Sequence, residues 1–237
     1  MIEELSIVIP LFNEWECVPS LVRELGRTGN ELPFLRRYEI IFVDDGSTDG
    51  TGLSLEQSIR FYPEMRMIRR PSRGGQTAAL FEGIRSARYS YIATMDGDLQ
   101  NSLQDLSRVA QVVPVPFGLA YGVRGKKRET LAKAIASFLG NWVFRTWSGV
   151  PLQDTGSPIR VFSRDCFSGV SEWNGLHRLL PLIAYKNGVP VNSIPVSHRS
   201  REFGRSKYGI WDRIVPVLRS LWAISSVNGF KAGHDLA

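Results

Sequence analysis

The sequence lacks the features that define several classes of protein. Its only two cysteines, Cys17 and Cys166, stand far apart and without metal-ligand spacing. This pattern argues against a disulfide scaffold and favours buried thiols in a reducing compartment. No uninterrupted run of about 18 apolar residues occurs, so no segment is expected to span a bilayer. The first ten residues carry Glu3 and Glu4 and no cationic stretch, which argues against a secretory signal.

Two common nucleotide-binding motifs are also absent. The glycines form neither the dinucleotide fingerprint G-x-G-x-x-G nor a Walker A loop. The formal charge of +6 and the pI near 9.5 nevertheless indicate an anionic partner: phosphates, a membrane surface or nucleic acid. Nucleic acid is the least favoured of the three, because no aromatic-interleaved stacking pattern or known binding module is present.

The remaining pattern predicts one α/β domain. The 237 residues, 43% hydrophobic and 22% charged, are enough for one substantial core. Short apolar runs alternate with segments of helical spacing; the expected strands are 5–10, 38–43, 65–69 and 91–95, and the expected helices are 15–25 and 76–87. This alternation predicts a parallel sheet with crossover helices, in which ligands bind outside the carboxyl ends of the strands.

Polar residues follow the predicted strands at that edge, namely Asn13, Asp44, Asp45, Asp96 and Asp98. Asp96 and Asp98 lie one residue apart at the end of an apolar strand, so their carboxylates share one face. Together with the amide oxygen of Gln100 they form a hard-oxygen set that suits Mg²⁺ or Mn²⁺. The alternative is that these aspartates, with Ser47 and Asp49, are ordinary turn and cap residues.

Several segments resemble the family 2 glycosyltransferases. The first three are Pro10-Leu11-Phe12-Asn13-Glu14, Val43-Asp44-Asp45-Gly46-Ser47-Thr48-Asp49-Gly50-Thr51 and Met95-Asp96-Gly97-Asp98-Leu99-Gln100. Later segments resemble the polyprenyl-phosphate branch, which includes dolichyl-phosphate mannose synthase-like enzymes; they are Asp154-Thr155-Gly156 with Arg160-Val161-Phe162, His177-Arg178-Leu179-Leu180-Pro181 and Arg201-Glu202-Phe203-Gly204-Arg205-Ser206-Lys207-Tyr208. The resemblance runs from about residue 5 to 210 and implies the GT-A fold, a Rossmann-like α/β domain.

The resemblance also implies roles for individual residues. A nucleotide-sugar donor would be held by Pro10, Leu11, Asn13, Glu14, Asp44, Asp45, Ser47 and Asp96. The metal, Mg²⁺ or Mn²⁺, would be bound by Asp96, Asp98 and Gln100. The acceptor phosphate would be bound by Arg124, Lys133, Ser137, Arg201 and Lys207. Asp98, Asp154 and Arg124 would lie where the chemistry takes place.

The sequence departs from the family pattern in places. Ser157-Pro158 stand where many relatives have Cys-Gly, and Ser102-Leu103 replace a proline pair after the D-x-D motif. Many bacterial relatives continue into transmembrane helices, whereas this sequence stops at Ala237. We therefore expect a GT-A domain over residues 1–208 and a tail over 209–237, with any missing transmembrane segment supplied by a separate membrane subunit.

The tail has two interpretations. Apolar residues between Ile210 and Trp222 fall near helical spacing, with Arg213 and Arg219 among them. This pattern suits a helix in the membrane interface, or else a terminal helix packed on the core.

The expected function is metal-dependent, inverting transfer of a sugar from a GDP-mannose or UDP-glucose type of donor to a polyprenyl phosphate. The place would be the cytoplasmic membrane face, with the protein peripheral and serving cell-envelope glycans. One alternative is transfer to a saccharide hydroxyl with Asp154 as base. Another is a non-catalytic nucleotide-sugar-binding module. The processive synthase motif Q-x-x-R-W is absent, so polymer synthesis is not expected.

Overall fold

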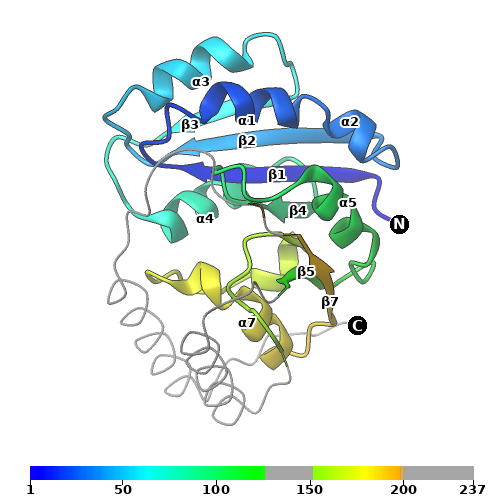
Figure 1. Cartoon of the computed structure of the whole chain (residues 1–237). Coiled ribbons are helices and arrows are strands. Elements are labelled where there is room, and N and C mark those ends of the chain that lie inside the picture. Colours follow the sequence, from blue (N-terminus) through cyan, green and yellow to red (C-terminus); the bar gives the residue numbers. More distant parts are fainter. Residues whose placement is uncertain (126–151, 198, 200–237) are drawn as a thin grey trace, which may run out of the picture.

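The computed structural model describes residues 1–125, 152–197 and 199 (Figure 1). Its centre is a seven-stranded sheet with the order β3-β2-β1-β4-β6-β5-β7. The strands are β1 (Glu4–Leu11), β2 (Arg37–Asp44), β3 (Met65–Arg69), β4 (Tyr91–Thr94), β5 (Leu119–Arg124), β6 (Arg160–Ser163) and β7 (Val191–Val196). Each predicted strand is present within one or two residues of its expected bounds, so the α/β prediction is confirmed.

The sheet is mostly parallel, with one strand running the other way. β3, β2, β1 and β4 are mutually parallel, and β5 is parallel to β7. β6 is antiparallel to both of its neighbours and pairs Arg160 with Thr94 of β4 and Tyr121 of β5. The start of β6 therefore lies at the carboxyl end of β4, two residues before Asp96.

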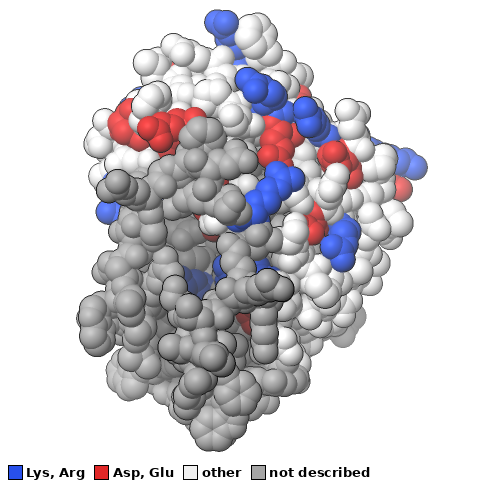
Figure 2. Space-filling view, viewed as in Figure 1, with Lys and Arg blue, Asp and Glu red and all other residues white. Residues whose placement is uncertain are grey.

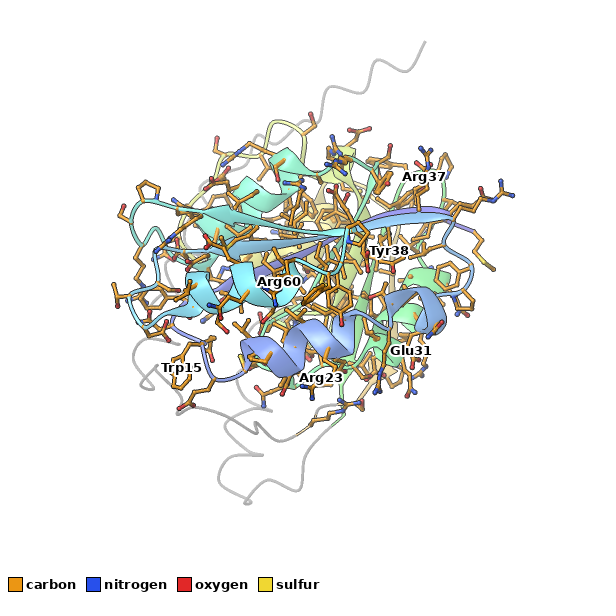
Figure 3. The ribbon with its side chains drawn as sticks, turned by 90° about the horizontal axis from the view of Figure 1, so that it is seen from above. Trp15, Arg23, Glu31, Arg37, Tyr38 and Arg60 are labelled. Atoms are coloured by element: carbon orange, nitrogen blue, oxygen red, sulfur yellow. The ribbon has the colours of Figure 1, made fainter. Side chains whose placement is uncertain are left out.

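Helices cover both faces of the sheet. The helices are α1 (Val18–Leu25), α2 (Thr28–Glu31), α3 (Thr51–Ile59), α4 (Gln76–Ser86), α5 (Leu103–Gln111) and α7 (Leu180–Lys186), with short 3-10 helices η1 (Arg164–Phe167) and η2 (Leu176–Arg178). The buried side chains of α1, α3 and α5 join one core cluster, and those of α4 and α7 join the other. Seen from above, α1 and α3 lie side by side over the sheet (Figure 3).

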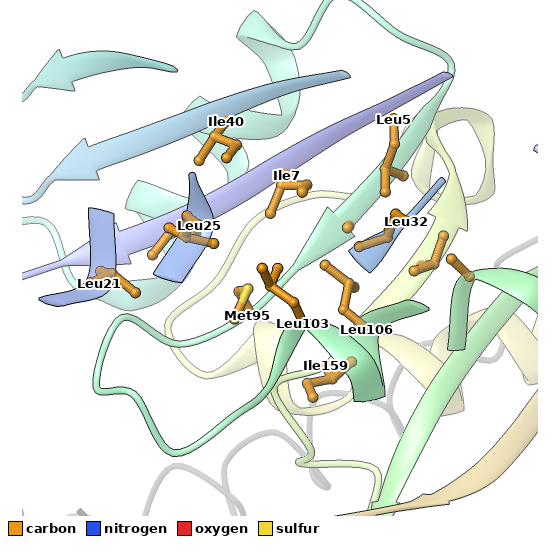
Figure 4. Close-up of a cluster of buried hydrophobic side chains, with 14 of the residues drawn as sticks. Leu5, Ile7, Leu21, Leu25, Leu32, Ile40, Met95, Leu103, Leu106 and Ile159 are labelled. Carbon is orange, nitrogen blue, oxygen red and sulfur yellow. The ribbon is translucent and has the colours of Figure 1, made fainter. Parts of the chain in front are cut away.

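Alternate residues of the central strands enter the two cores. In β1, Ile7 and Ile9 face the first cluster, whereas Val8 faces the second, and all three are fully buried. Figure 4 shows the first cluster, where Leu21 and Leu25 of α1 and Leu103 and Leu106 of α5 pack on Ile7 and its neighbours. Burial on both faces explains why these strands are continuous apolar runs.

Two further expectations concern membrane-spanning helices and the C-terminal tail. No helix within the described residues is long and apolar enough to cross a membrane. The expected tail, residues 209–237, lies outside the described residues, so the division into a domain and a tail stays a prediction.

Candidate active site

The loops after β1 and β2 are joined by reciprocal hydrogen bonds. The backbone N–H of Asn13 donates to Ser47 Oγ at 2.9 Å, and the Asn13 side-chain oxygen accepts from the N–H of Thr48 at 2.9 Å. The backbone N–H of Glu14 donates to Thr51 Oγ1 at 2.8 Å. Asn13 has a φ of 53°, in the left-handed region that asparagine tolerates. The predicted donor residues Asn13, Glu14 and Ser47 are therefore brought together.

Pro10 and Leu11 contribute to this edge from within β1. They pair in register with Val43 and Asp44 of β2. The Leu11 side chain is 2% exposed and packs against Gly97 so closely that a Cβ there would lie 2.2 Å from it. Gly97 is thus required by close packing between the two aspartates, because only glycine leaves room for Leu11.

Asp44 is a fully buried carboxylate at the end of β2. Its Oδ1 accepts from the N–H of Ser47 at 3.0 Å. Its Oδ2 has no hydrogen-bond partner, and the nearest cation is the Arg69 guanidinium, whose Nε lies 3.8 Å away. Since a buried polar atom is normally hydrogen-bonded, Oδ2 is an acceptor available to a ligand N–H or O–H group.

Asp45 accepts hydrogen bonds from the loop that leads into α4. Its two oxygens accept from the N–H groups of Gly74 and Gly75 at 2.9 and 2.7 Å, and Arg70 lies 3.3 Å away. This carboxylate fixes the turn that opens α4. Arg73, in the same turn, lies over the Phe12 ring at 4.3 Å from its centroid.

The D-x-D motif follows β4, as predicted. Asp96 Oδ1 accepts from the side-chain amide of Gln76, the first residue of α4, at 2.9 Å. Asp98 Oδ1 accepts from the N–H of Gln100 at 3.2 Å, which forms a tight turn. Leu99 has a φ of 61°, which is rare for an apolar side chain and marks a backbone held in place by its surroundings.

Gln100 connects the D-x-D turn to the chain beyond β7. Its side-chain N–H donates to the carbonyl of Arg199 at 3.2 Å, and its own carbonyl accepts from the N–H of Arg199 at 3.0 Å. Ser197 is held nearby, because its N–H donates to Asp105 Oδ2 at 3.1 Å and its hydroxyl donates to the same oxygen. The side-chain oxygen of Gln100 takes no part in this contact.

Arg124 and Asp154 form an ion pair at the end of β5. Asp154 Oδ2 accepts from the Arg124 backbone N–H and Nε, both at 2.9 Å, and Oδ1 accepts from Nη2 at 2.6 Å. Hydrogen bonding to Asp154 raises the pKa of Arg124. Asp154 has a φ of 44°. The three residues that were predicted to lie where the chemistry takes place, Asp98, Arg124 and Asp154, therefore lie at the same edge of the sheet.

Two buried residues of this edge had no assigned role in the sequence analysis. Arg160 is 2% exposed; burial lowers its pKa to about 10, so it stays charged at neutral pH. His177 is 9% exposed, and burial followed by the charge of Arg160 lowers its pKa to about 3. Both stand in family-like segments, but their burial depends on β6 pairing with β4 and β5 and on η2 packing against α4, which no local pattern predicts.

Four predicted acceptor residues, Lys133, Ser137, Arg201 and Lys207, lie outside the described residues. Arg199, two residues before Arg201, is described and contacts the D-x-D turn through Gln100. On the face of the molecule in Figure 2, basic and acidic side chains are interspersed over the described part of the surface.

The donor set at the D-x-D motif fits a hard divalent cation. Asp96 and Asp98 are half-buried carboxylates, each with about four lone-pair sites, and Gln100 offers a neutral oxygen. Mg²⁺ and Mn²⁺ are bound in this way by one or two carboxylates, with substrate phosphates and water completing the shell. Within the described residues, no cluster of three or more His, Cys, Asp or Glu side chains has metal-binding geometry.

Comparison with sequence families identifies about three fifths of the chain. The model of glycosyl transferase family 2 matches residues 6–148. The chain is 35% identical to dodecaprenyl-phosphate galacturonate synthase of Rhizobium johnstonii, covering 98% of this chain and 70% of that protein. It is 31% identical to undecaprenyl-phosphate 4-deoxy-4-formamido-L-arabinose transferase of Pseudomonas fluorescens, covering 95% of this chain and 68% of that one.

Solved structures share the fold at low sequence identity. A mannosyltransferase of Pyrobaculum calidifontis, in complex with GDP-Man and Mn²⁺, superposes with a TM-score of 0.69 at 17% identity, covering 95% of this chain and 64% of that one. Glucosyl-3-phosphoglycerate synthase of Mycobacterium tuberculosis, in complex with Mn²⁺, UDP-Glc and phosphoglyceric acid, gives a TM-score of 0.65 at 16% identity, covering 93% and 80%. At these identities the similarity shows the fold alone, and that fold is GT-A.

Proposed function

Because this chain belongs to glycosyl transferase family 2 and is a glycosyltransferase, we propose that it transfers a sugar from a nucleotide-sugar to a polyprenyl phosphate. The observation that carries the proposal is the similarity, over nearly the whole of this chain, to two enzymes whose names specify prenyl-phosphate acceptors. Their names specify different sugars, so the transferred sugar is not implied by the similarity. We propose an inverting reaction in which the acceptor phosphate itself attacks the anomeric carbon.

The buried carboxylate of Asp44 supports binding of the donor base. Its Oδ2 accepts no hydrogen bond, and Arg69 lies 3.8 Å away as a donor. An acceptor next to a donor complements a base edge that presents an N–H group beside an acceptor atom, as uracil and guanine do. Phe12 beneath Arg73 offers an aromatic surface at the same edge. This pairing supports our proposal of a donor of the UDP-glucose or GDP-mannose type.

The metal, Mg²⁺ or Mn²⁺, would be held by Asp96, Asp98 and Gln100 and would stabilise the negative charge that develops on the leaving diphosphate. Basic side chains of the protein would reduce the repulsion between the donor diphosphate and the acceptor phosphate. Arg124 is one such group within the described residues, and Lys133, Ser137, Arg201 and Lys207 are proposed to bind the acceptor phosphate. The link between Gln100 and Arg199 supports this arrangement, because it anchors the chain next to the metal-binding turn two residues before Arg201.

The geometry of Asp154 makes the saccharide-hydroxyl alternative less favourable. A hydroxyl acceptor needs a base, but both oxygens of Asp154 accept hydrogen bonds from Arg124. A phosphate acceptor is already ionised and needs none. We further propose that the protein works as a peripheral protein at the cytoplasmic membrane face, where residues 210–222 and a membrane subunit would bring it to its lipid.

The test is a panel of nucleotide-sugars, incubated with Mg²⁺ or Mn²⁺ and with or without a short-chain polyprenyl phosphate. We expect a lipid-soluble glycosyl phosphate to form with one donor only when metal and prenyl phosphate are both present. Transfer to a soluble saccharide in the absence of prenyl phosphate would replace the proposal with the alternative. Binding of a nucleotide-sugar with no transfer to any acceptor would favour the non-catalytic binding module.

A further inference from the structure

Arg160 is a buried arginine that forms no ion pair within the described residues. It is 2% exposed, and among the described groups its Nε has no hydrogen-bond partner. Its Nη2 donates to the backbone carbonyl of Thr155 over a long distance of 3.3 Å. Since a buried charge is normally paired and hydrogen-bonded, a guanidinium with so little direct contact is unusual. Its positive charge therefore acts on the groups around it rather than on a single bound partner.

The sheet places Arg160 on the face that α4 covers. Antiparallel pairing sets it opposite Thr94 of β4. Side chains two residues apart on a strand share a face, and Phe162 packs in the same core cluster as the buried side chains of α4. Gln76, the first residue of α4, donates to Asp96, which follows Thr94 by two residues. Arg160 and Asp96 therefore lie at the same corner, between the end of β4 and the start of α4.

Asp96 is the carboxylate that balances the charge of Arg160. Burial lowers the pKa of Arg160 to about 10, while the negative charges of Asp96 and then of Asp154 act in the opposite direction, so the guanidinium stays charged at neutral pH. Asp154 already accepts hydrogen bonds from the Arg124 guanidinium on both of its oxygens. The carboxylate that is left for Arg160 is thus Asp96, which is also a proposed metal ligand.

A divalent cation held by Asp96 would come close to this buried positive charge. Charges repel one another more strongly in a buried site than in water, because the lower dielectric screens them less. This repulsion opposes binding of the metal by itself. A diphosphate brings negative charge to the same corner and offsets the repulsion, so each of the two ligands should bind more tightly when the other is present.

From this arrangement we infer that Arg160 makes divalent-metal binding at the D-x-D motif depend on a nucleoside diphosphate. The inference rests on the proposed function and adds a positioning residue to it, since Arg160 acts on the metal through Asp96. Its effect is to favour the complex that holds metal and nucleotide together over the complex with metal alone.

Three variants of Arg160 separate its charge from its packing. Arg160→Met removes the charge and keeps a long side chain, Arg160→Gln removes the charge and keeps an N–H donor, and Arg160→Lys keeps the charge. Arg164→Met is the matched control. Arg164 follows the other end of β6, donates to the carbonyls of Ala87 and Tyr89, and also has a buried Nε without a partner among the described groups.

Mn²⁺ affinity is measured by electron paramagnetic resonance without nucleotide and with saturating UDP or GDP, whichever binds, and is corrected for Mn²⁺ held by free nucleotide. The ratio of the two affinities should be about fivefold or more in the wild-type protein. Arg160→Met and Arg160→Gln should bind Mn²⁺ more tightly than the wild type without nucleotide, and their ratio should be about threefold smaller or less. Arg160→Lys and Arg164→Met should keep the wild-type ratio.

A purely structural role of Arg160 would change both affinities by the same factor and leave their ratio unaltered, which would overturn the inference. Weaker Mn²⁺ binding by both neutral variants in the absence of nucleotide would also overturn it. If neither neutral variant folds, the wild-type ratio still decides, because a value below about twofold refutes the inference without any variant. A wild-type protein that binds neither Mn²⁺ nor a nucleoside diphosphate would defeat the proposed function instead.

Discussion

The carboxylate of Asp154 receives three hydrogen bonds from a single residue, Arg124. Two come from the guanidinium, at 2.9 and 2.6 Å, and one comes from the backbone N–H at 2.9 Å. Such a fork-shaped contact holds both groups in fixed orientations. It also gives Asp154 a role that requires negative charge, because a proton on either oxygen would displace a donor. Asp154 is therefore built as a counter-ion that orients Arg124.

The first prediction concerns this pair. Asp154→Asn should lower kcat/KM by about 5- to 30-fold, corresponding to about 1–2 kcal/mol for a partly exposed charge-assisted contact. The measurement is kcat/KM against pH for both proteins. If Asp154 were a general base, its loss would instead lower kcat/KM by about 100- to 10,000-fold. It would also remove from the pH profile the fall in kcat/KM at low pH.

The second prediction concerns the metal. Asp96→Asn or Asp98→Asn should abolish most activity and weaken Mn²⁺ binding, because the amide keeps the volume of the side chain but loses its charge. Chelation should have the same effect on the parent protein. Mn²⁺ binding by electron paramagnetic resonance and the melting temperature are measured together. Asp165→Asn, at an exposed position of η1, is the matched control and should change neither.

Full activity of either D-x-D variant in the presence of a chelator would remove the metal from the proposal. A loss of activity accompanied by a large fall in melting temperature would instead assign the aspartate to the structure of the turn. Gln76 donates a hydrogen bond to Asp96. Because this bond should stabilise the fold whether or not metal is bound, its contribution to the melting temperature is separate from the binding of metal.

The edge of the sheet was predictable because it depends on local patterns. Apolar runs of strand length predict β1, β2, β3 and β4, and parallel pairing then brings their carboxyl ends together. Asn13, Asp44 and Asp96 follow from that rule alone. Polar residues placed directly after buried strands therefore identify a candidate site without any knowledge of side-chain contacts.

The rest of the site depends on contacts between distant residues. Gln100 meets Arg199 from 99 positions away in the sequence, and Thr77 meets His177 from 100 positions away. Arginine is usually a surface residue, but Arg160 is buried because β6 enters the sheet antiparallel to β4. No periodicity in the sequence indicates such an insertion. Asp45 likewise accepts hydrogen bonds from the turn that opens α4, a contact that the local sequence does not reveal.

The third prediction concerns stability at the opposite edge of the sheet. Glu39 of β2 is 2% exposed; burial alone would raise its pKa, but hydrogen bonds from the Arg88 N–H, Arg66 and Ser6 lower it overall. A lowered folded-state pKa stabilises the fold above the unfolded-state pKa and loses that effect as the pH falls. Glu39→Gln should therefore reduce the free energy of unfolding by about 1.5–3 kcal/mol at neutral pH.

This difference should shrink as the pH falls below 4.5, the ordinary pKa of a glutamate, because the unfolded chain then takes up a proton that the folded carboxylate resists. Urea unfolding of both proteins at neutral and acid pH measures it, with exposed Glu56→Gln on α3 as control. A destabilisation that stays constant with pH would mean that packing, rather than charge, holds this residue.

The last prediction separates two roles of Gln100. Its side-chain oxygen is assigned to the metal, and its side-chain N–H donates to the carbonyl of Arg199. Gln100→Glu keeps an oxygen for the metal but loses the donor, whereas Gln100→Ala loses both. If the bond to Arg199 positions the acceptor segment, Gln100→Glu should raise the KM for prenyl phosphate about three- to tenfold, as for one hydrogen bond, and leave Mn²⁺ affinity unchanged or tighter. Gln100→Ala should weaken both. Because Ser197 is held independently by Asp105, the fold around residue 199 should persist in either variant, and melting temperatures check that it does. Equal kinetics for Gln100→Glu and the parent protein would restrict Gln100 to the metal and leave the acceptor segment without this anchor.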